Sequence, residues 1–160
     1  MNRPTLQIVS GGQTGVDRGA LDAALAAGVP CGGACPAGRR AEDGPIPARY
    51  PLTTLDDPGY AARTEANVRD TDATLILCPG PPTGGTELTR RFAERHGRPV
   101  LLVDADRLSP DEAAGEARRF VAGHGVTRLN VAGPRASGWP AGADYARHTI
   151  AVLIESWETS

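Results

Sequence analysis

Residues 6–27 read LQIVSGGQTGVDRGALDAALAA, and this stretch decides the fold class. Leu6 to Ser10 is a short apolar run typical of a buried strand, and the glycine-rich segment 11–15 follows it at once. Apolar side chains then recur at helical spacing from Val16 to Ala27, and Gly28 ends the helix. A strand, a glycine-rich turn and a helix in this order indicate an α/β protein with a parallel sheet.

The rest of the chain repeats this alternation of strand and helix. Strands are predicted over residues 29–31, 50–55, 73–77, 99–103 and 128–132, and helices over residues 60–70, 86–96, 110–122 and 144–157. We therefore predict one domain, residues 1–160, folded as a Rossmann-like three-layer α/β/α sandwich with a mostly parallel six-stranded sheet. The expected strand order, 3-2-1-4-5-6, places a ligand crevice beyond the carboxyl ends of the first and fourth strands.

The composition excludes several classes of function. The net charge is −2, and all 17 basic residues are arginines. A chain without lysine cannot form a Schiff base with pyridoxal phosphate or supply the phosphate-binding lysine of a P-loop. No long run of one charge sign occurs, so nucleic acid is not an expected partner. No stretch approaches the ~20 apolar residues of a membrane span, so no membrane contact is expected either.

The three cysteines bear on compartment and metal binding. Their odd number and the lack of a signal peptide predict reduced thiols in a cytoplasmic protein. Cys31 and Cys35 are spaced C-x3-C without two further ligands nearby, so we predict no metal site. No nucleophile–base–orienter triad is readable, and no catalytic residue is assigned.

Two glycine-rich loops, after the first and fourth predicted strands, each run into a helix. The unpaired N–H groups and partial positive charge of a helix N-terminus attract anions, and glycines let an anion approach the backbone. The first loop is neither a Walker motif nor a dinucleotide fingerprint, so a tight turn without a ligand remains an alternative. Asp17 either caps the helix or serves the site. The binding candidates here are Gly11, Gly12, Gln13, Thr14, Gly15 and, one turn into the helix, Arg18.

The second loop raises the number of anion-binding groups. Thr86 can donate a hydroxyl and a backbone N–H to phosphate, whereas Glu87 either stabilises the helix dipole or binds a ribose or pterin group. Residues 36–49 form a loop rich in Pro, Gly and Arg, long enough to suggest a function. Residues after the last strand point to the same sheet edge and either complete the pocket or serve the loop alone. The further candidates are Arg39, Gly84, Gly85, Thr86, Glu87, Arg135 and Ser137.

Several segments resemble the molybdenum cofactor carrier family. They are residues 10–22, 38–47, 50–52, 63–64, 67–68, 72, 84–86 and 129–135, so the resemblance extends over nearly the whole chain. It implies a Rossmann-like homo-oligomer, a dimer or a tetramer, that binds molybdenum cofactor or a related phosphorylated anionic small molecule without transforming it. Apolar residues on more than one face of the last predicted helix agree with such an assembly.

An enzyme is the alternative. The fold also resembles the phosphoribohydrolases that activate cytokinins, whose signature P-G-G-x-G-T-x-x-E ends in a catalytic glutamate. Gly84-Gly85-Thr86 matches that signature only loosely, and Thr89 stands where the acid belongs, although Glu87 lies close. We therefore expect a carrier rather than a hydrolase of nucleoside 5′-monophosphates. A nucleotide-sensing module is a third reading.

Overall fold

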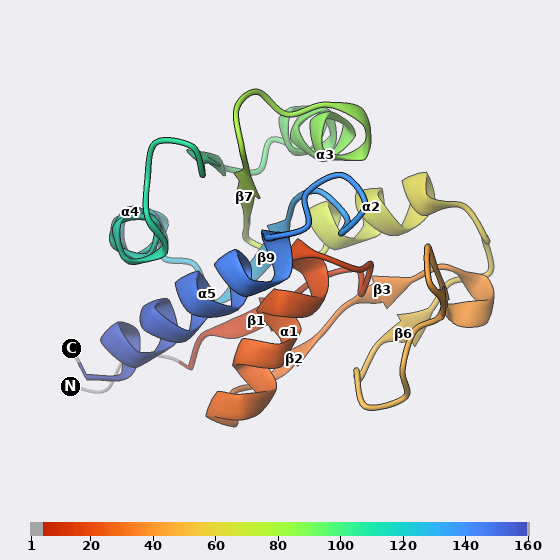
Figure 1. Ribbon diagram of the computed structural model, residues 1–160, viewed down its shortest axis with the longest axis horizontal. Helices are drawn as coiled ribbons and strands as arrows, with labels where there is room; N and C mark the ends of the chain where they lie inside the picture. The colour runs from red at the N-terminus through yellow and green to blue at the C-terminus, as the bar shows by residue number, and fades with distance from the viewer. Residues whose placement is uncertain (1–4, 160) are drawn as a thin grey trace.

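The computed structural model describes residues 5–159 and has a five-stranded parallel sheet at its centre (Figure 1). The strands are β1 (Gln7–Val9), β2 (Cys31–Gly32), β7 (Ala73–Cys78), β8 (Val100–Asp104) and β9 (Arg128–Ala132). Every neighbouring pair in this sheet runs parallel. The alternation of strands and helices therefore produces the predicted Rossmann-like α/β fold.

The prediction of six strands in one sheet is wrong. Segment 50–55 contains only the two-residue strand β6 (Thr53–Thr54), which pairs with β3 (Ala34–Cys35) in a separate two-stranded sheet. Thr53 and Thr54 are both exposed. A strand of a parallel sheet that is covered on both faces needs a continuous apolar run, whereas this segment has threonines at its paired positions and places Tyr50 and Leu52 in the second core.

The expected strand order is also wrong, in an informative way. The observed order is β2-β1-β9-β7-β8, so the last strand of the chain lies at the middle of the sheet between β1 and β7. Counting β9 as the first strand turns this order into 3-2-1-4-5, the arrangement of a Rossmann-like sheet. The start of β1 and the end of α5 (Gly142–Glu158) lie on the same side of the molecule (Figure 1), as a cyclic reordering of the chain requires.

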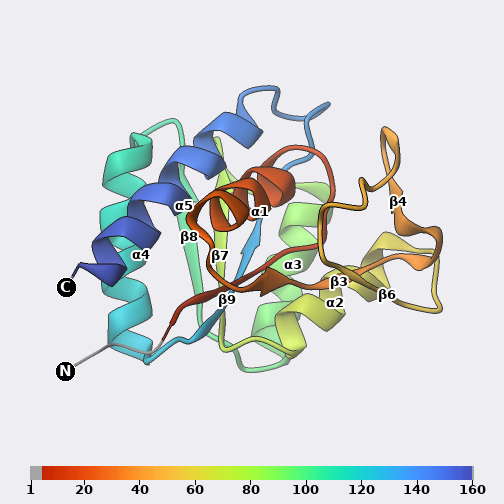
Figure 2. The same cartoon turned by 90° about the horizontal axis from the view of Figure 1, so that it is seen from below.

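Helices cover both faces of the sheet. One face carries α1 (Val16–Ala27), α4 (Pro110–His124) and α5, and the other carries α2 (Tyr60–Arg69) and α3 (Gly84–Arg95) (Figure 2). Each helix begins and ends within two residues of its predicted position, because local signals mark the ends. At the start of α4, for example, the Ser109 side chain accepts the Glu112 N–H and the Glu112 side chain accepts the Ser109 N–H.

The main core lies between the sheet and the helices α1, α4 and α5. All six residues of β7 are buried, and Leu75 and Leu77 pack into this core. The helices α1 and α5 approach closely at Gly19, where a Cβ atom would lie only 2.2 Å from the carbonyl oxygen of Ala143. The contact between these two helices therefore depends on the absence of a side chain at position 19.

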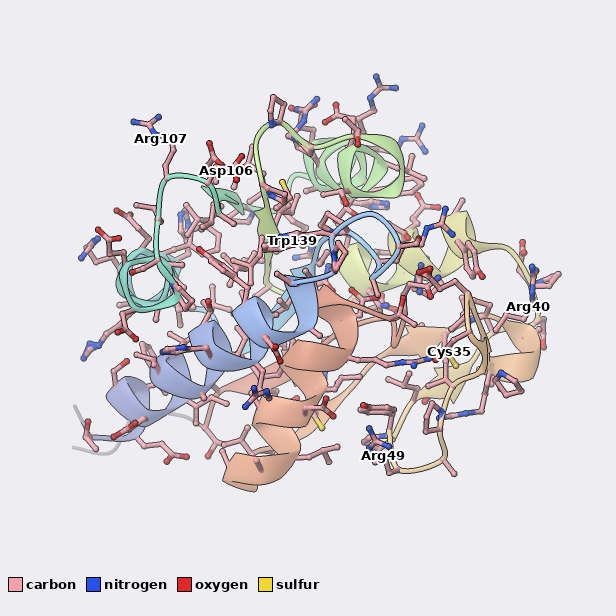
Figure 3. All side chains as sticks on the ribbon, viewed as in Figure 1. Cys35, Arg40, Arg49, Asp106, Arg107 and Trp139 are labelled. Atoms are coloured by element: carbon pink, nitrogen blue, oxygen red, sulfur yellow. The ribbon has the colours of Figure 1, made fainter. Side chains whose placement is uncertain are left out.

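The loop predicted over residues 36–49 is ordered around a core of its own. It contains the 3-10 turn η1 (Ala37–Arg39) and a hairpin of β4 (Arg40–Ala41) and β5 (Gly44–Pro45). Its apolar side chains pack on α1, and Figure 3 shows Cys35 beneath the loop with Arg40 at its outer end. The second core consists of Leu21, Cys35, Ile46 and Tyr50.

Candidate ligand-binding site

A cavity of about 430 Å³ opens at the carboxyl ends of β1, β9 and β7. Its sides are formed by α2 and by the proline-rich loop 79–83 that leads into α3. This is the sheet edge at which open α/β proteins bind ligands, and the volume falls in the range of small-molecule sites. The cavity is therefore the candidate functional site.

The N-terminus of α3 faces this cavity with free hydrogen-bond donors. The N-cap residue Thr83 makes no side-chain capping bond, and within the described residues the N–H groups of Gly84 and Gly85 have no acceptor. A Cβ atom at either glycine would meet nothing within 4 Å. Thr86 lines the cavity and is only 7% exposed, and its hydroxyl donates to no group in the described part of the chain. These donors suit an anion.

Arg63 on α2 brings a positive charge into the cavity wall. The residue is only 8% exposed, and its Nη1 donates to the carbonyl oxygen of Gly11 at 3.1 Å. Its guanidinium also stacks on the Tyr60 ring, 5.4 Å from the ring centroid. A Cβ atom at Gly11 would lie 2.3 Å from the Arg63 Cδ, so the first glycine of the first loop makes room for this arginine.

Asp17 places a buried carboxylate on the same cavity. It is 8% exposed, and its Oδ2 accepts the Gln13 N–H at 3.2 Å and lies 3.8 Å from Arg63 Nη1. Burial raises the pKa of Asp17 to about 6, against the opposing influence of Arg63. The carboxylate therefore takes up an amide of the loop before α1, and the Val16 N–H at the start of α1 donates to the Pro134 carbonyl at 3.3 Å, so this helix start is less open than that of α3.

Three buried polar side chains complete the lining and hold its frame. Asn130 on β9 donates its Nδ2 to the Thr74 hydroxyl at 3.2 Å, and Thr89 on α3 donates to the Gly85 carbonyl at 3.0 Å. Asn67 on α2 accepts the Ala34 N–H at 2.8 Å. The Asn130 bond links β9 to β7 and the Asn67 bond links α2 to β3, whereas the Thr89 bond lies within the first turns of α3.

The structure brings six of the predicted site residues to the cavity. Both glycine-rich loops contribute, together with the loop after β9. These six are Gly11, Gln13, Gly84, Gly85, Thr86 and Arg135. The other seven lie outside the cavity lining, and contacts within the protein occupy them. They are Gly12, Thr14, Gly15, Arg18, Arg39, Glu87 and Ser137.

Arg18 and Gly12 serve the packing of the first loop against its neighbours. Arg18 donates two hydrogen bonds to the Asp43 carboxylate, at 2.6 and 2.8 Å, and a third to the Gly12 carbonyl. Gly12 has φ of 76°, and a Cβ atom there would lie 2.4 Å from Leu52 Cδ1. A bulky residue at Gly12 would therefore disturb the fold itself.

Thr14 and Ser137 meet at a third residue, Glu42. The Glu42 carboxylate accepts the Thr14 hydroxyl at 2.7 Å and the Ser137 hydroxyl at 3.3 Å. These bonds, led by that from Thr14, lower the pKa of Glu42. The three side chains tie together the first glycine loop, the 36–49 loop and the loop after β9.

Gly15, Arg39 and Glu87 also have contacts that explain their positions. A Cβ atom at Gly15 would lie 2.5 Å from the Pro134 carbonyl oxygen. Arg39 donates to the carbonyls of loop residues 46, 47 and 50, which organises the loop from within. Glu87 forms ion pairs with Arg90 and Arg91 on the outside of α3.

Sequence reasoning did not select Arg63, Asn67 or Asn130 as site residues, and it left Asp17 open. Arg63 lies inside a helix with an ordinary polar pattern, and no local signal separates a buried arginine from a solvated one. Asn130 is the more readable case, because it is a polar residue within the apolar strand β9, near the end that faces the ligand edge.

Residues 8–154 match the family described as the circularly permutated YpsA SLOG family. The chain belongs to this family. It is also similar to the crystal structure of a putative molybdenum carrier protein from Syntrophus aciditrophicus SB, with 40% identity and a TM-score of 0.91. That similarity covers 96% of this chain and 97% of the other. No curated protein sequence matches the chain.

Membership of the circularly permutated YpsA SLOG family agrees with the central position of β9, the last strand of the chain. Among the described residues no helix combines the length and apolar character needed to cross a membrane. Within residues 5–159 no three His, Cys, Asp or Glu side chains are grouped to hold a metal ion.

Proposed function

We propose that this protein binds and carries a phosphorylated anionic small molecule in the cavity, with its phosphate at the N-terminus of α3. The observation that carries the proposal is the set of free donors there, formed by the amides of Gly84 and Gly85 and the hydroxyl of Thr86. Arg63 and Arg135 line the same cavity and supply positive charge. The first loop is the weaker phosphate site, because Asp17 already puts a negative charge at the start of α1.

Molybdenum cofactor is the ligand we propose, carried as cargo. The structural relative is described as a putative molybdenum carrier protein, and 40% identity over nearly the whole chain supports a shared class of ligand. Molybdenum cofactor carries a phosphate for the α3 donors and a pterin for the remainder of the cavity. A cytoplasmic location and a homo-oligomeric state, dimer or tetramer, belong to the same proposal. The apolar residues of α5 lend the oligomer little support, because Ile150, Leu153 and Ile154 are buried within the chain.

Phosphate recognition can be tested with simple compounds. We expect ribose 5-phosphate to bind in calorimetry and ribose not to bind, because only the phosphate engages the α3 donors. Thr86→Val keeps the shape of the side chain and removes the hydroxyl, and should weaken ribose 5-phosphate by about tenfold, the value of one hydrogen bond to a charged group. Equal binding of ribose and ribose 5-phosphate would show that the cavity does not select phosphate.

Hydrolysis of nucleoside 5′-monophosphates is the alternative that the site favours less. Thr89 occupies the position of the catalytic glutamate in the phosphoribohydrolase signature and bonds to the Gly85 carbonyl, while Glu87 pairs with arginines outside the cavity lining. We therefore predict no release of free base from AMP or GMP over hours at micromolar protein concentration. Base release that disappears in Glu87→Gln or in Asp17→Asn would instead establish an enzyme and name its acid.

A further inference from the structure

Asp17 is the one acidic residue among the described residues that line the cavity. The residue is only 8% exposed, and its partners within the protein leave acceptor positions of the carboxylate free. Oδ2 accepts the Gln13 N–H at 3.2 Å, the Gly11 backbone N–H also stabilises the carboxylate, and the nearest guanidinium nitrogen, on Arg63, lies at 3.8 Å, beyond a good hydrogen bond. A carboxylate offers about four acceptor positions, so Asp17, which lines the cavity, keeps acceptor capacity for a ligand there.

Contacts within the protein do not fully offset the cost of burying the charged Asp17 carboxylate. Burial outweighs the attraction of Arg63 and of the backbone N–H groups, and raises the pKa of Asp17 to about 6. A ligand that donates hydrogen bonds would recover part of that desolvation cost, whereas a ligand that presents only acceptors would add to it. The buried acid therefore selects for donors at its end of the cavity and against a second anionic group.

The cavity therefore has a donor end and an acceptor end, and these determine the orientation of a bound ligand. The α3 end offers the N–H donors of Gly84 and Gly85 and the hydroxyl of Thr86, and the α1 end offers a carboxylate acceptor, Asp17. A molecule that satisfies both has a phosphate at one end and N–H donors at the other. A planar ring with adjacent ring N–H and amino groups matches a carboxylate best, because two parallel N–H bonds can reach its two oxygens.

We infer that Asp17 is a specificity-determining residue that binds the 2-amino-4-oxo-pyrimidine edge of a phosphorylated heterocycle, the edge that guanine and pterins share. This inference rests on the proposed function, since it requires phosphate to occupy the α3 end. Guanine nucleotides and pterins are two sources of the same edge, and two matched pairs of compounds separate them. Inosine has hydrogen in place of the 2-amino group of guanosine, and lumazine has an oxo group, an acceptor, in place of that of pterin.

The test compares matched ligands on the wild-type protein and on Asp17→Asn. We expect GMP to bind about tenfold more tightly than IMP, and pterin more tightly than lumazine by a similar factor, as measured by calorimetry and by quenching of pteridine fluorescence. Asp17→Asn should reduce both ratios to near one while ribose 5-phosphate binds at least as tightly as before. A preference seen only for GMP over IMP would identify a guanine nucleotide as the ligand, and one seen only for pterin over lumazine would identify a pterin.

Asp43→Asn is the matched control, because Asp43 lies outside the cavity lining and pairs with Arg18. It should leave both ratios unchanged. Equal affinities of the wild-type protein for the members of both pairs, or ratios that survive in Asp17→Asn, would overturn the inference. Failure of ribose 5-phosphate, GMP and IMP all to bind would contradict the proposed function itself, so the two failures are distinguishable.

A second readout needs no variant and guards against misfolding of Asp17→Asn. The wild-type GMP-to-IMP ratio should be largest at pH 8 and fall as the pH drops through about 6, because protonation of Asp17 removes its acceptor. The charged groups that act on Asp17 are Arg63 from α2 and Arg18 from α1, Arg135 from the loop after β9 lines the same cavity, and arginines stay protonated throughout this range. The ligand phosphate titrates identically in GMP and IMP and cancels in the ratio. A ratio independent of pH between 5 and 8 would contradict a role for the Asp17 carboxylate.

Discussion

Gly85→Asp should abolish phosphate binding while leaving the fold intact. Gly85 lies in the first turn of α3, its backbone is outside the left-handed region, and its Cβ position has open space around it. A carboxylate there would stand beside the phosphate. Two like charges about 4 Å apart repel by roughly 4 kcal/mol at an effective dielectric constant near 20, so a loss of at least about a hundredfold in affinity for ribose 5-phosphate is expected.

Gly85→Asn is the control that separates charge from bulk. Asparagine has nearly the size of aspartate without its charge, so this variant should lose much less affinity than Gly85→Asp in the same calorimetric titration. Thermal unfolding of both should stay close to that of the wild-type protein. If Gly85→Asp binds ribose 5-phosphate as tightly as the wild-type protein does, the phosphate does not lie at α3.

Gly19→Ala should be strongly destabilising although it adds only one methyl group. The new Cβ atom would lie 2.2 Å from the Ala143 carbonyl oxygen, and this neighbour is backbone within α5, which cannot rotate away. The helices α1 and α5 would have to separate over a buried interface. Overpacking of this kind costs about 3 kcal/mol, which lowers the melting temperature of a protein of this size by roughly 6–12 °C.

Gly115→Ala gives the opposite result for the same chemical change. Gly115 lies inside α4, where a Cβ atom would make only an ordinary contact, 3.8 Å from the flexible Arg119 side chain. Replacing glycine by alanine in a helix interior stabilises it by up to about 1 kcal/mol. Urea denaturation of the two variants should therefore shift in opposite directions. Equal shifts would mean that α1 and α5 do not pack as closely as the structure shows.

Local patterns in the sequence predicted the helices and much of the phosphate end of the site. Helical spacing of apolar residues with Gly28 at its end defined α1, and Ser109 with Glu112 defined the start of α4. Gly84, Gly85 and Thr86 were recognisable because a strand, a glycine pair and a helix stand next to one another in the chain. Each of these signals acts over one or two turns of backbone, so a linear reading can find it.

Contacts between distant segments required the structure. The position of β9 between β1 and β7 depends on which strand edges meet, and the strand sequence alone fits more than one order. The same limit explains Arg18, a charged residue beside a helix N-terminus that pairs with Asp43 from the 36–49 loop. Glu87 differs, because its partner Arg90 lies three residues away on the same helix.

The sequence by itself determined that this protein has an α/β fold with the glycine pair Gly84-Gly85 leading into a helix, since periodicity, caps and glycines are properties of adjacent residues. Only the tertiary structure decided that Asp17 and Arg63, from α1 and α2, meet at 3.8 Å on the wall of one cavity. Whether a charged side chain is buried beside a partner or solvated depends on how separate elements pack across the sheet. No pattern within either helix carries that information.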